Sequence, residues 1–217
     1  MKKEVIIMEF RKSKITYLFL LIAAGLSIYF WIAVKSGSPL SFDQYMTNLM
    51  TGIFTEFSYP FFTLMDRIGS KLGIGIVSLL FVLWLWMKKK DYLAMAAFVF
   101  AVAFGNEINK MLKNAAGRPR PDLEHLVTVK SLSFPSGHAM MGMILYLMVV
   151  YFIISGLESK AVKWVIGIVA GIWILLMGIS RVVMQVHYPS DVAAGFAMGF
   201  IWVFIWISLY GMLYKGK

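Results

Sequence analysis

Cysteine is absent from the 217-residue sequence, and charged side chains are scarce. Without a thiol, the chain can form no disulfide framework, no thiolate metal site and no cysteine nucleophile. Charged residues make up 15% of the chain, against about 25% in an average soluble domain. Apolar residues make up 60%, and the mean hydropathy is +0.76. This composition excludes an ordinary soluble domain and also a disordered chain.

Acidic residues are few as well: there are 11, against 21 lysines and arginines, for a net charge of +10. In a soluble protein such an excess would suggest a nucleic-acid partner. In a chain this apolar it indicates membrane topology instead, because basic residues collect in cytoplasmic loops. We therefore expect a lipid bilayer as the surroundings and no nucleic-acid partner. Nothing in the sequence predicts an oligomeric state.

Six apolar runs are long enough, or nearly so, to cross a bilayer as helices, which takes about 20 residues. The runs cover residues 15–34, 72–87, 92–108, 139–154, 162–179 and 192–214. The first run follows basic residues, as in a signal peptide, but it exceeds the roughly 7–15 apolar residues of such peptides. The sequence predicts an all-α fold, a six-transmembrane-helix bundle that forms a single integral membrane domain over residues 1–217.

The segment 38–70, between the first two runs, is only moderately apolar. Within it, Leu49, Ile53 and Phe57 recur at helical spacing among polar residues, which is typical of a helix lying on a membrane surface. We expect one or two interfacial amphipathic helices here, between transmembrane helices 1 and 2. A plain connector is the alternative.

The lysines and arginines near the ends of the runs predict the orientation of the chain. Twelve of the 21 lie on the side that holds both termini, and nine lie on the other side, together with seven of the 11 acidic residues. This asymmetry predicts a multi-pass protein of the cell membrane with both termini in the cytoplasm. The nine basic residues on the outer side then need another explanation.

Three polar clusters lie in two loops that face the same, outer side, because two runs separate the loops. Together the clusters hold four cations, two of the three histidines and one aspartate. Three of the cations (Lys113, Arg120 and Arg181), the two histidines and the aspartate can therefore converge. The clusters consist of Lys113, Arg118 and Arg120; of Pro135, Ser136, Gly137 and His138; and of Ser180, Arg181, His187 and Asp191.

These residue types suit a phosphate site. Ser136 and Gly137 directly precede a predicted helix, whose N-terminal N–H groups bind anions, and glycine allows close backbone approach. Lys113, Arg120 and Arg181 bring three positive charges to a group that carries about −1.5 to −2. Alone, a basic loop could merely bind anionic lipid head groups. The three clusters on one side favour a phosphate site.

His187 and Asp191 are four residues apart at the start of the last run, a spacing that puts them on one helix face. Pro189 lies between them and is tolerated as a first-turn residue. The carboxylate can fix the tautomer of the imidazole and leave its other nitrogen free to attack. His138 can then protonate the leaving oxygen. The third histidine, His125, belongs to no cluster, and we expect a non-catalytic loop residue.

The order and spacing of these residues resemble the type 2 phosphatidic acid phosphatase superfamily, which also includes vanadium haloperoxidases and acid phosphatases. The pattern Lys-x6-Arg-Pro, Pro-Ser-Gly-His and Ser-Arg-x5-His-x3-Asp occupies residues 113–191, and the six-span layout extends the resemblance to nearly the whole chain. The resemblance implies that His187 is a nucleophile that forms a phosphohistidine, that Asp191 orients it and that His138 is the acid. It also implies that the phosphate is held by Lys113, Arg120, Ser136, Gly137 and Arg181, without a cofactor or a metal ion.

Within this superfamily the membrane build implies a lipid phosphate as substrate, at a site that opens to the outer side. The Pro-Ser-Gly-His form and the compact size resemble bacterial phosphatases of phosphatidylglycerophosphate or phosphatidic acid type. An undecaprenyl diphosphate phosphatase is an alternative, and so is a lipid-to-lipid phosphotransferase that uses the same site. A transporter or structural membrane protein with a vestigial site is the alternative outside the enzymes.

Overall fold

The structure, a computed structural model, describes residues 13–214, and these form helices and loops without a β-strand. The predicted all-α fold is therefore confirmed. The helices of the described part are α2 (Lys14–Lys35), α3 (Ser41–Ile53), η1 (Glu56–Ser58), α4 (Tyr59–Gly69), α5 (Lys71–Trp84), η2 (Leu85–Lys89), α6 (Tyr92–Ala116), α7 (Gly137–Ile154), α8 (Lys160–Val183) and α9 (Pro189–Tyr214).

Six helical segments are long and apolar enough to cross a membrane, as the sequence predicts. They are α2, α5 continued through η2, α6, α7, α8 and α9. The single domain over residues 1–217 stays a prediction. Part of the orientation argument falls on terminal residues that lie outside the described range: Lys2, Lys3, Arg11, Lys12, Lys215 and Lys217.

Two helices extend further than their apolar runs, so two motif residues predicted to lie in loops lie in helices instead. The predicted span over 92–108 continues to Ala116, where Gly117 ends the helix with a left-handed φ of 68°. The predicted span over 162–179 continues to Val183. Lys113 and Arg181 therefore lie in the last turns of helices and not in loops, because a helix can continue past the apolar segment once its polar residues find partners.

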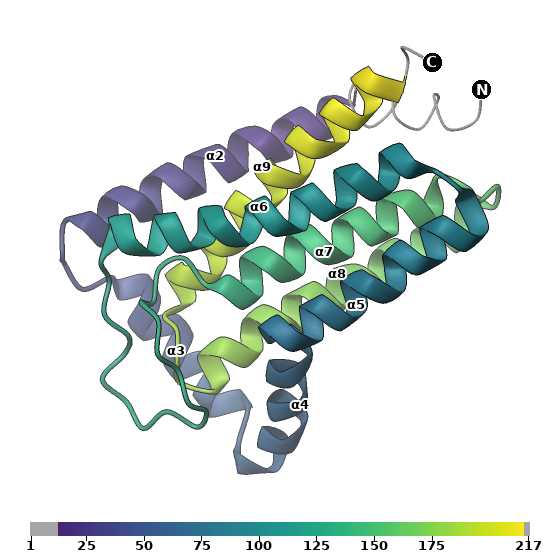
Figure 1. Cartoon of the computed structure of the whole chain (residues 1–217). Coiled ribbons are helices and arrows are strands. Elements are labelled where there is room, and N and C mark those ends of the chain that lie inside the picture. Colours follow the sequence, from purple (N-terminus) through teal and green to yellow (C-terminus); the bar gives the residue numbers. More distant parts are fainter. Residues whose placement is uncertain (1–12, 215–217) are drawn as a thin grey trace.

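The helices form a bundle whose two ends differ in kind (Figure 1). The first turn of α2 and the last turn of α9 lie at one end, and α3, α4 and the long loop between α6 and α7 lie at the other. α7 runs through the middle of the bundle, and many of its residues from Ala139 to Phe152 are buried. The motif clusters thus gather at a single end of the molecule.

Close approach between α7 and α9 depends on two glycines spaced as Gly-x3-Gly, a spacing that lets membrane helices pack backbone to backbone. A Cβ atom on Gly195 would lie 2.8 Å from the carbonyl oxygen of Ser136, and one on Gly199 would lie 2.8 Å from that of Met140. The start of α7 is therefore pressed directly against α9.

The segment 38–70 forms two amphipathic helices, α3 and α4, joined by a 3-10 turn. In α3, Asp43 faces inward and is buried, whereas Phe42, Tyr45 and Leu49 are exposed. Apolar side chains that point away from the protein fit a helix lying in the lipid interface. The helices are confirmed, and their interfacial placement stays a prediction.

Candidate active site

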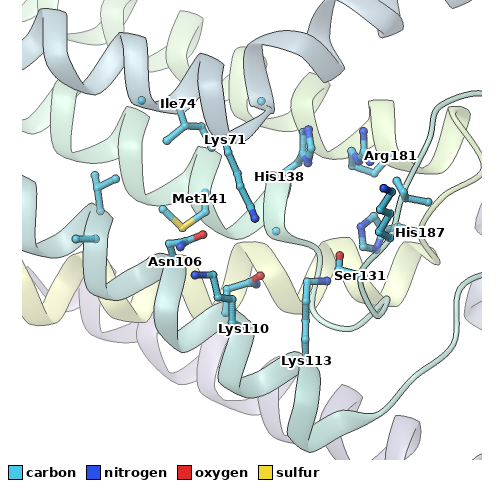
Figure 2. A pocket seen from close by; sticks show the side chains of 18 of the residues that line it. Lys71, Ile74, Asn106, Lys110, Lys113, Ser131, His138, Met141, Arg181 and His187 are labelled. Carbon is cyan, nitrogen blue, oxygen red and sulfur yellow. The ribbon is translucent and has the colours of Figure 1, made fainter.

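The three polar clusters meet around one cavity of about 530 Å³ at the loop-bearing end of the bundle (Figure 2). Six of the eight predicted site residues line it: Lys113, Arg120, Gly137, His138, Arg181 and His187. The other two, Ser136 and Asp191, are fully buried and do not line the cavity. The structure therefore brings together residues from α6, α7, α8 and the loops beside them.

His187 and Asp191 form the pair that their spacing predicts. His187 Nδ1 lies 3.3 Å from Asp191 Oδ2, and since a carboxylate accepts, Nδ1 carries the hydrogen. Burial lowers the pKa of His187 to about 3, against the raising effect of Asp191. The ring is thus neutral, and its Nε2 lone pair remains available at the cavity wall.

The carboxylate of Asp191 is itself held by several donors. Its Oδ2 accepts hydrogen bonds from the Ser133 hydroxyl at 2.5 Å and from the Tyr188 N–H at 3.0 Å. Its Oδ1 accepts from Arg118 at 2.6 Å. Asp191 therefore has a fixed orientation, which it passes on to the imidazole of His187.

The cations of the cavity are oriented by backbone carbonyl groups. Lys113 Nζ donates to the carbonyl oxygens of Leu132 at 2.6 Å and Ser133 at 2.9 Å. Arg120 Nη1 donates to the carbonyl oxygen of Val186 at 2.5 Å. Burial, and then the charge of Arg181, lower the pKa of Arg120 to about 10. Like charges held this close together make a site that an anion would stabilise.

The start of α7 carries the other two predicted phosphate-binding residues, Ser136 and Gly137. Gly137 is the first residue of the helix and lines the cavity, where its backbone can approach an anion. Ser136 is the N-cap, and its hydroxyl accepts a hydrogen bond from the Ala139 N–H. In this structure the Ser136 hydroxyl caps the helix and does not face the cavity.

An aspartate that the sequence analysis passed over joins the second histidine. His138 Nε2 lies 3.1 Å from the carbonyl oxygen of Asp66 and 3.2 Å from its Oδ1. Asp66 Oδ1 also forms an ion pair with Arg181. Burial raises the pKa of Asp66, but hydrogen bonding from His138 and the charge of Arg181 outweigh it, and the net pKa is lowered. Asp66 lies on α4, 72 residues from His138, so no local spacing points to the contact.

A second missed pair involves Arg118, which the sequence analysis placed in the first cluster without a role. Arg118 forms ion pairs with both Asp191 and Asp43 of α3, and so joins the two carboxylates.

His125, predicted to be non-catalytic, does not line the cavity. Its Nε2 lies 3.0 Å from the carbonyl oxygen of Pro121. Among residues 13–214, no group of three or more His, Asp or Glu side chains could hold a metal ion.

Several known proteins are similar to this chain in sequence. The model of the PAP2 superfamily matches residues 92–215. Phosphatidylglycerophosphatase B of Bacillus subtilis strain 168 is 43% identical over 101 residues, which cover 45% of this chain and 49% of the relative. Lipid A 1-phosphatase of Rhizobium johnstonii is 34% identical over 108 residues, which cover 45% of this chain and 40% of that relative. The chain thus spans at most about half the length of these curated relatives.

Two solved structures have a similar fold. The crystal structure of a transmembrane PAP2-type phosphatidylglycerolphosphate phosphatase from Bacillus subtilis superposes with a TM-score of 0.76 at 25% identity, covering 90% of this chain and 97% of that one. The crystal structure of Aquifex aeolicus LpxE gives a TM-score of 0.58 at 20% identity over 82% and 97% of the two chains. The second likeness bears on the fold alone.

Proposed function

Because the chain belongs to the PAP2 superfamily, we propose that it is an integral membrane lipid phosphatase that works through a phosphohistidine. The observation that carries this proposal is the neutral, buried imidazole of His187, held by Asp191 at the wall of a cavity lined with cations. A neutral imidazole is a nucleophile, and fixed cations suit a phosphoryl group in the transition state.

The proposed reaction has two steps. In the first, His187 Nε2 attacks phosphorus, the bond from phosphorus to the lipid oxygen breaks, and His138, as its imidazolium, gives a proton to that oxygen and becomes neutral. In the second, water attacks phosphorus, the bond from phosphorus to His187 Nε2 breaks, a proton of the water passes to the neutral His138, and inorganic phosphate leaves. Since His138 Nε2 contacts Asp66 here, the acid step requires His138 to exchange that contact for the leaving oxygen.

The cavity also has the chemistry for a lipid. Beyond the cations it continues between α5, α6 and α7, where Ile74, Val102 and Met141 line it. Lys71 reaches into the same cavity from the start of α5 (Figure 2). Lys110, whose Nζ forms an ion pair with Glu107 at 2.6 Å, lines the cavity as well. These two lysines suit a second phosphate on the substrate.

We therefore favour phosphatidylglycerophosphate, which carries both a phosphomonoester and a phosphodiester, over phosphatidic acid. The 43% identical relative is named for activity on that lipid. Undecaprenyl diphosphate also carries two phosphates and remains the alternative substrate. A lipid-to-lipid phosphotransferase is the alternative reaction.

The test is a substrate panel on the purified protein in detergent. Phosphatidylglycerophosphate, phosphatidic acid and undecaprenyl diphosphate are compared by release of inorganic phosphate, with orthovanadate as inhibitor. We expect His187→Ala to abolish release and His125→Ala, the matched control outside the cavity, to retain it. If no lipid phosphate is hydrolysed by the folded wild-type protein, the proposal fails. Transfer to a second lipid in excess of phosphate release would identify the phosphotransferase.

A further inference from the structure

Arg118 lies at the centre of a buried polar network behind the cavity. Its Nη1 donates hydrogen bonds to Asp191 Oδ1 at 2.6 Å and to Ser190 Oγ at 2.8 Å. Its Nη2 donates to Asp43 Oδ2 at 2.7 Å. The guanidinium also stacks on the ring of Tyr188, with Cζ 3.8 Å from the ring centroid. The Arg118 side chain is only 13% exposed.

Asp43 anchors the far side of this network. Its Oδ1 accepts the Ser190 N–H at 2.8 Å, and its Oδ2 accepts the Ser190 hydroxyl at 2.8 Å. Asp43 is in the first turn of α3, whereas Ser190 is in the first turn of α9. One carboxylate thus ties the amphipathic helix α3 to the helix that carries Asp191.

Neither Arg118 nor Asp43 lines the cavity that holds the cations. Asp43 lines a separate cavity on the other side of His187, together with Tyr188. Arg120, only two residues from Arg118, does line it. The two arginines of this loop therefore face different groups, one a substrate site and the other a pair of carboxylates. This placement argues against a role for Arg118 in binding phosphate.

We propose that Arg118 and Asp43 are positioning residues for the nucleophile. This inference rests on the proposed function. Asp191 uses Oδ2 to contact His187 and Oδ1 to contact Arg118. With both oxygens held, the carboxylate cannot turn away from the imidazole. The contacts run from α3 through Arg118 and Asp191 to His187.

An arginine suits this position better than a lysine. Its planar fork presents separate N–H groups to two carboxylates in fixed directions, whereas an ammonium group is a single point charge on a flexible stem. Burial by itself lowers the pKa of Arg118, but the charges of Asp191 and Asp43 outweigh burial, and the net pKa is raised. The guanidinium is therefore stabilised by both carboxylates. R118K should keep the charge and lose the fork.

The experiment measures kcat and KM of R118K and D43N for phosphatidylglycerophosphate, with inhibition by inorganic phosphate as a probe of the anion site. We expect R118K to lower kcat by about 10- to 100-fold, the usual range for residues that orient a functional side chain. KM and the inhibition constant of phosphate should stay within about threefold, because the cavity cations are untouched. D43N should lower kcat less than R118K.

The controls are R67K on the exposed face of α4 and E56Q in the exposed turn η1. Both should leave kcat and KM unchanged. Because Arg118 and Asp43 act as one unit, the double variant R118K/D43N should be little slower than R118K alone. If R118K does not fold, D43N carries the test by itself.

Two results would overturn the inference while the wild-type enzyme stays active. One is an unchanged kcat in folded R118K and D43N. The other is a raised KM and a raised phosphate inhibition constant with kcat unchanged, which would make Arg118 a phosphate ligand. An inactive wild-type protein would instead overturn the proposed function on which the inference rests.

Discussion

At the scale of single residues, the two cavity histidines have different surroundings. His187 is buried and shares its hydrogen with Asp191, whereas His138 points its Nε2 at Asp66. A neutral imidazole with a free lone pair suits attack on phosphorus, and an imidazole that becomes protonated beside a carboxylate suits proton donation as the imidazolium. The same residue type therefore supports two proposed roles.

These roles predict that the two histidine variants respond differently to the leaving group. General acid catalysis is typically worth about 10²–10⁴-fold, and a lipid alkoxide needs it far more than a nitrophenolate. We expect His138→Ala to lose about that factor on a lipid phosphate and to retain more activity on an aryl phosphate. His187→Ala should be inactive on both. Equal losses in both variants on both substrates would contradict the assignment, provided that the wild-type protein accepts the aryl phosphate.

The burial of His187 also predicts how stability depends on pH. Its folded pKa of about 3 lies below the unfolded value of about 6.5. As the pH falls from about 6.5 toward 3, the unfolded chain binds a proton that the folded protein does not, so stability falls by up to about 1.4 kcal/mol per pH unit. Thermal denaturation in detergent at pH 7 and pH 5 should show a larger loss for the wild-type protein than for His187→Gln. Identical losses would mean that His187 titrates normally in the folded protein.

At the scale of helices, the site depends on how closely α9 packs against the start of α7. A methyl group on Gly195 would meet the Ser136 carbonyl oxygen at 2.8 Å and Ala139 Cβ at 3.0 Å. Neither neighbour is the end of a flexible side chain, so the backbone around Gly137 would have to move.

Gly195→Ala should therefore lower both stability and activity. Overpacking of this kind costs about 1–3 kcal/mol, and the displaced helix start would shift the anion-binding backbone. Gly171→Ala on α8 is the matched control, because no heavy atom lies within 4 Å of its added Cβ. Thermal inactivation in detergent and phosphate release report the two effects. A Gly195→Ala variant as stable and active as the control would show that the two helices can separate without harm.

The helices were largely predictable because apolar runs of membrane length leave little freedom in fold class. The polar ends of the helices were harder to predict. Lys113 and Arg181 lie in the last turns of α6 and α8, but a charged residue after an apolar run is typical of a loop, and their burial is not visible in the sequence. His187 and Asp191 could be paired from their spacing alone. Asp43 and Asp66 could not, since they reach their partners from segments 75 and 115 residues away, respectively.

At the scale of the whole molecule, positive charge is concentrated where the reaction is proposed. Lys113, Arg120 and Arg181 all line one cavity. Three fixed cations can neutralise a phosphoryl group, which leaves no electrostatic task for a divalent ion. We expect phosphate release to persist in excess chelator. Loss of activity that Mg²⁺ specifically restores would contradict this mechanism.

The asymmetry of basic residues predicts which end of the bundle faces outward. The connection between η2 and α6 lies at the end opposite to α3 and α4 (Figure 1). Lys88 and Lys89 are the last residues of η2, and Lys90 lies in the connection. Lys130 lies in the long loop at the cavity. The positive-inside rule therefore predicts that this lysine-bearing end is cytoplasmic and that the cavity opens to the outer side.

Single-cysteine labelling tests this orientation directly. Since the sequence contains no cysteine, K130C and K88C each carry one thiol without further changes. An impermeant thiol reagent on intact cells should label K130C and spare K88C, because Lys130 and Lys88 are both exposed but lie at opposite ends of the bundle. Permeabilised cells should label both variants, which controls for reactivity. If only K88C were labelled in intact cells, the chain would have the opposite orientation, with the cavity on the cytoplasmic side. Lipid phosphates would then have to reach the cavity from the inner leaflet.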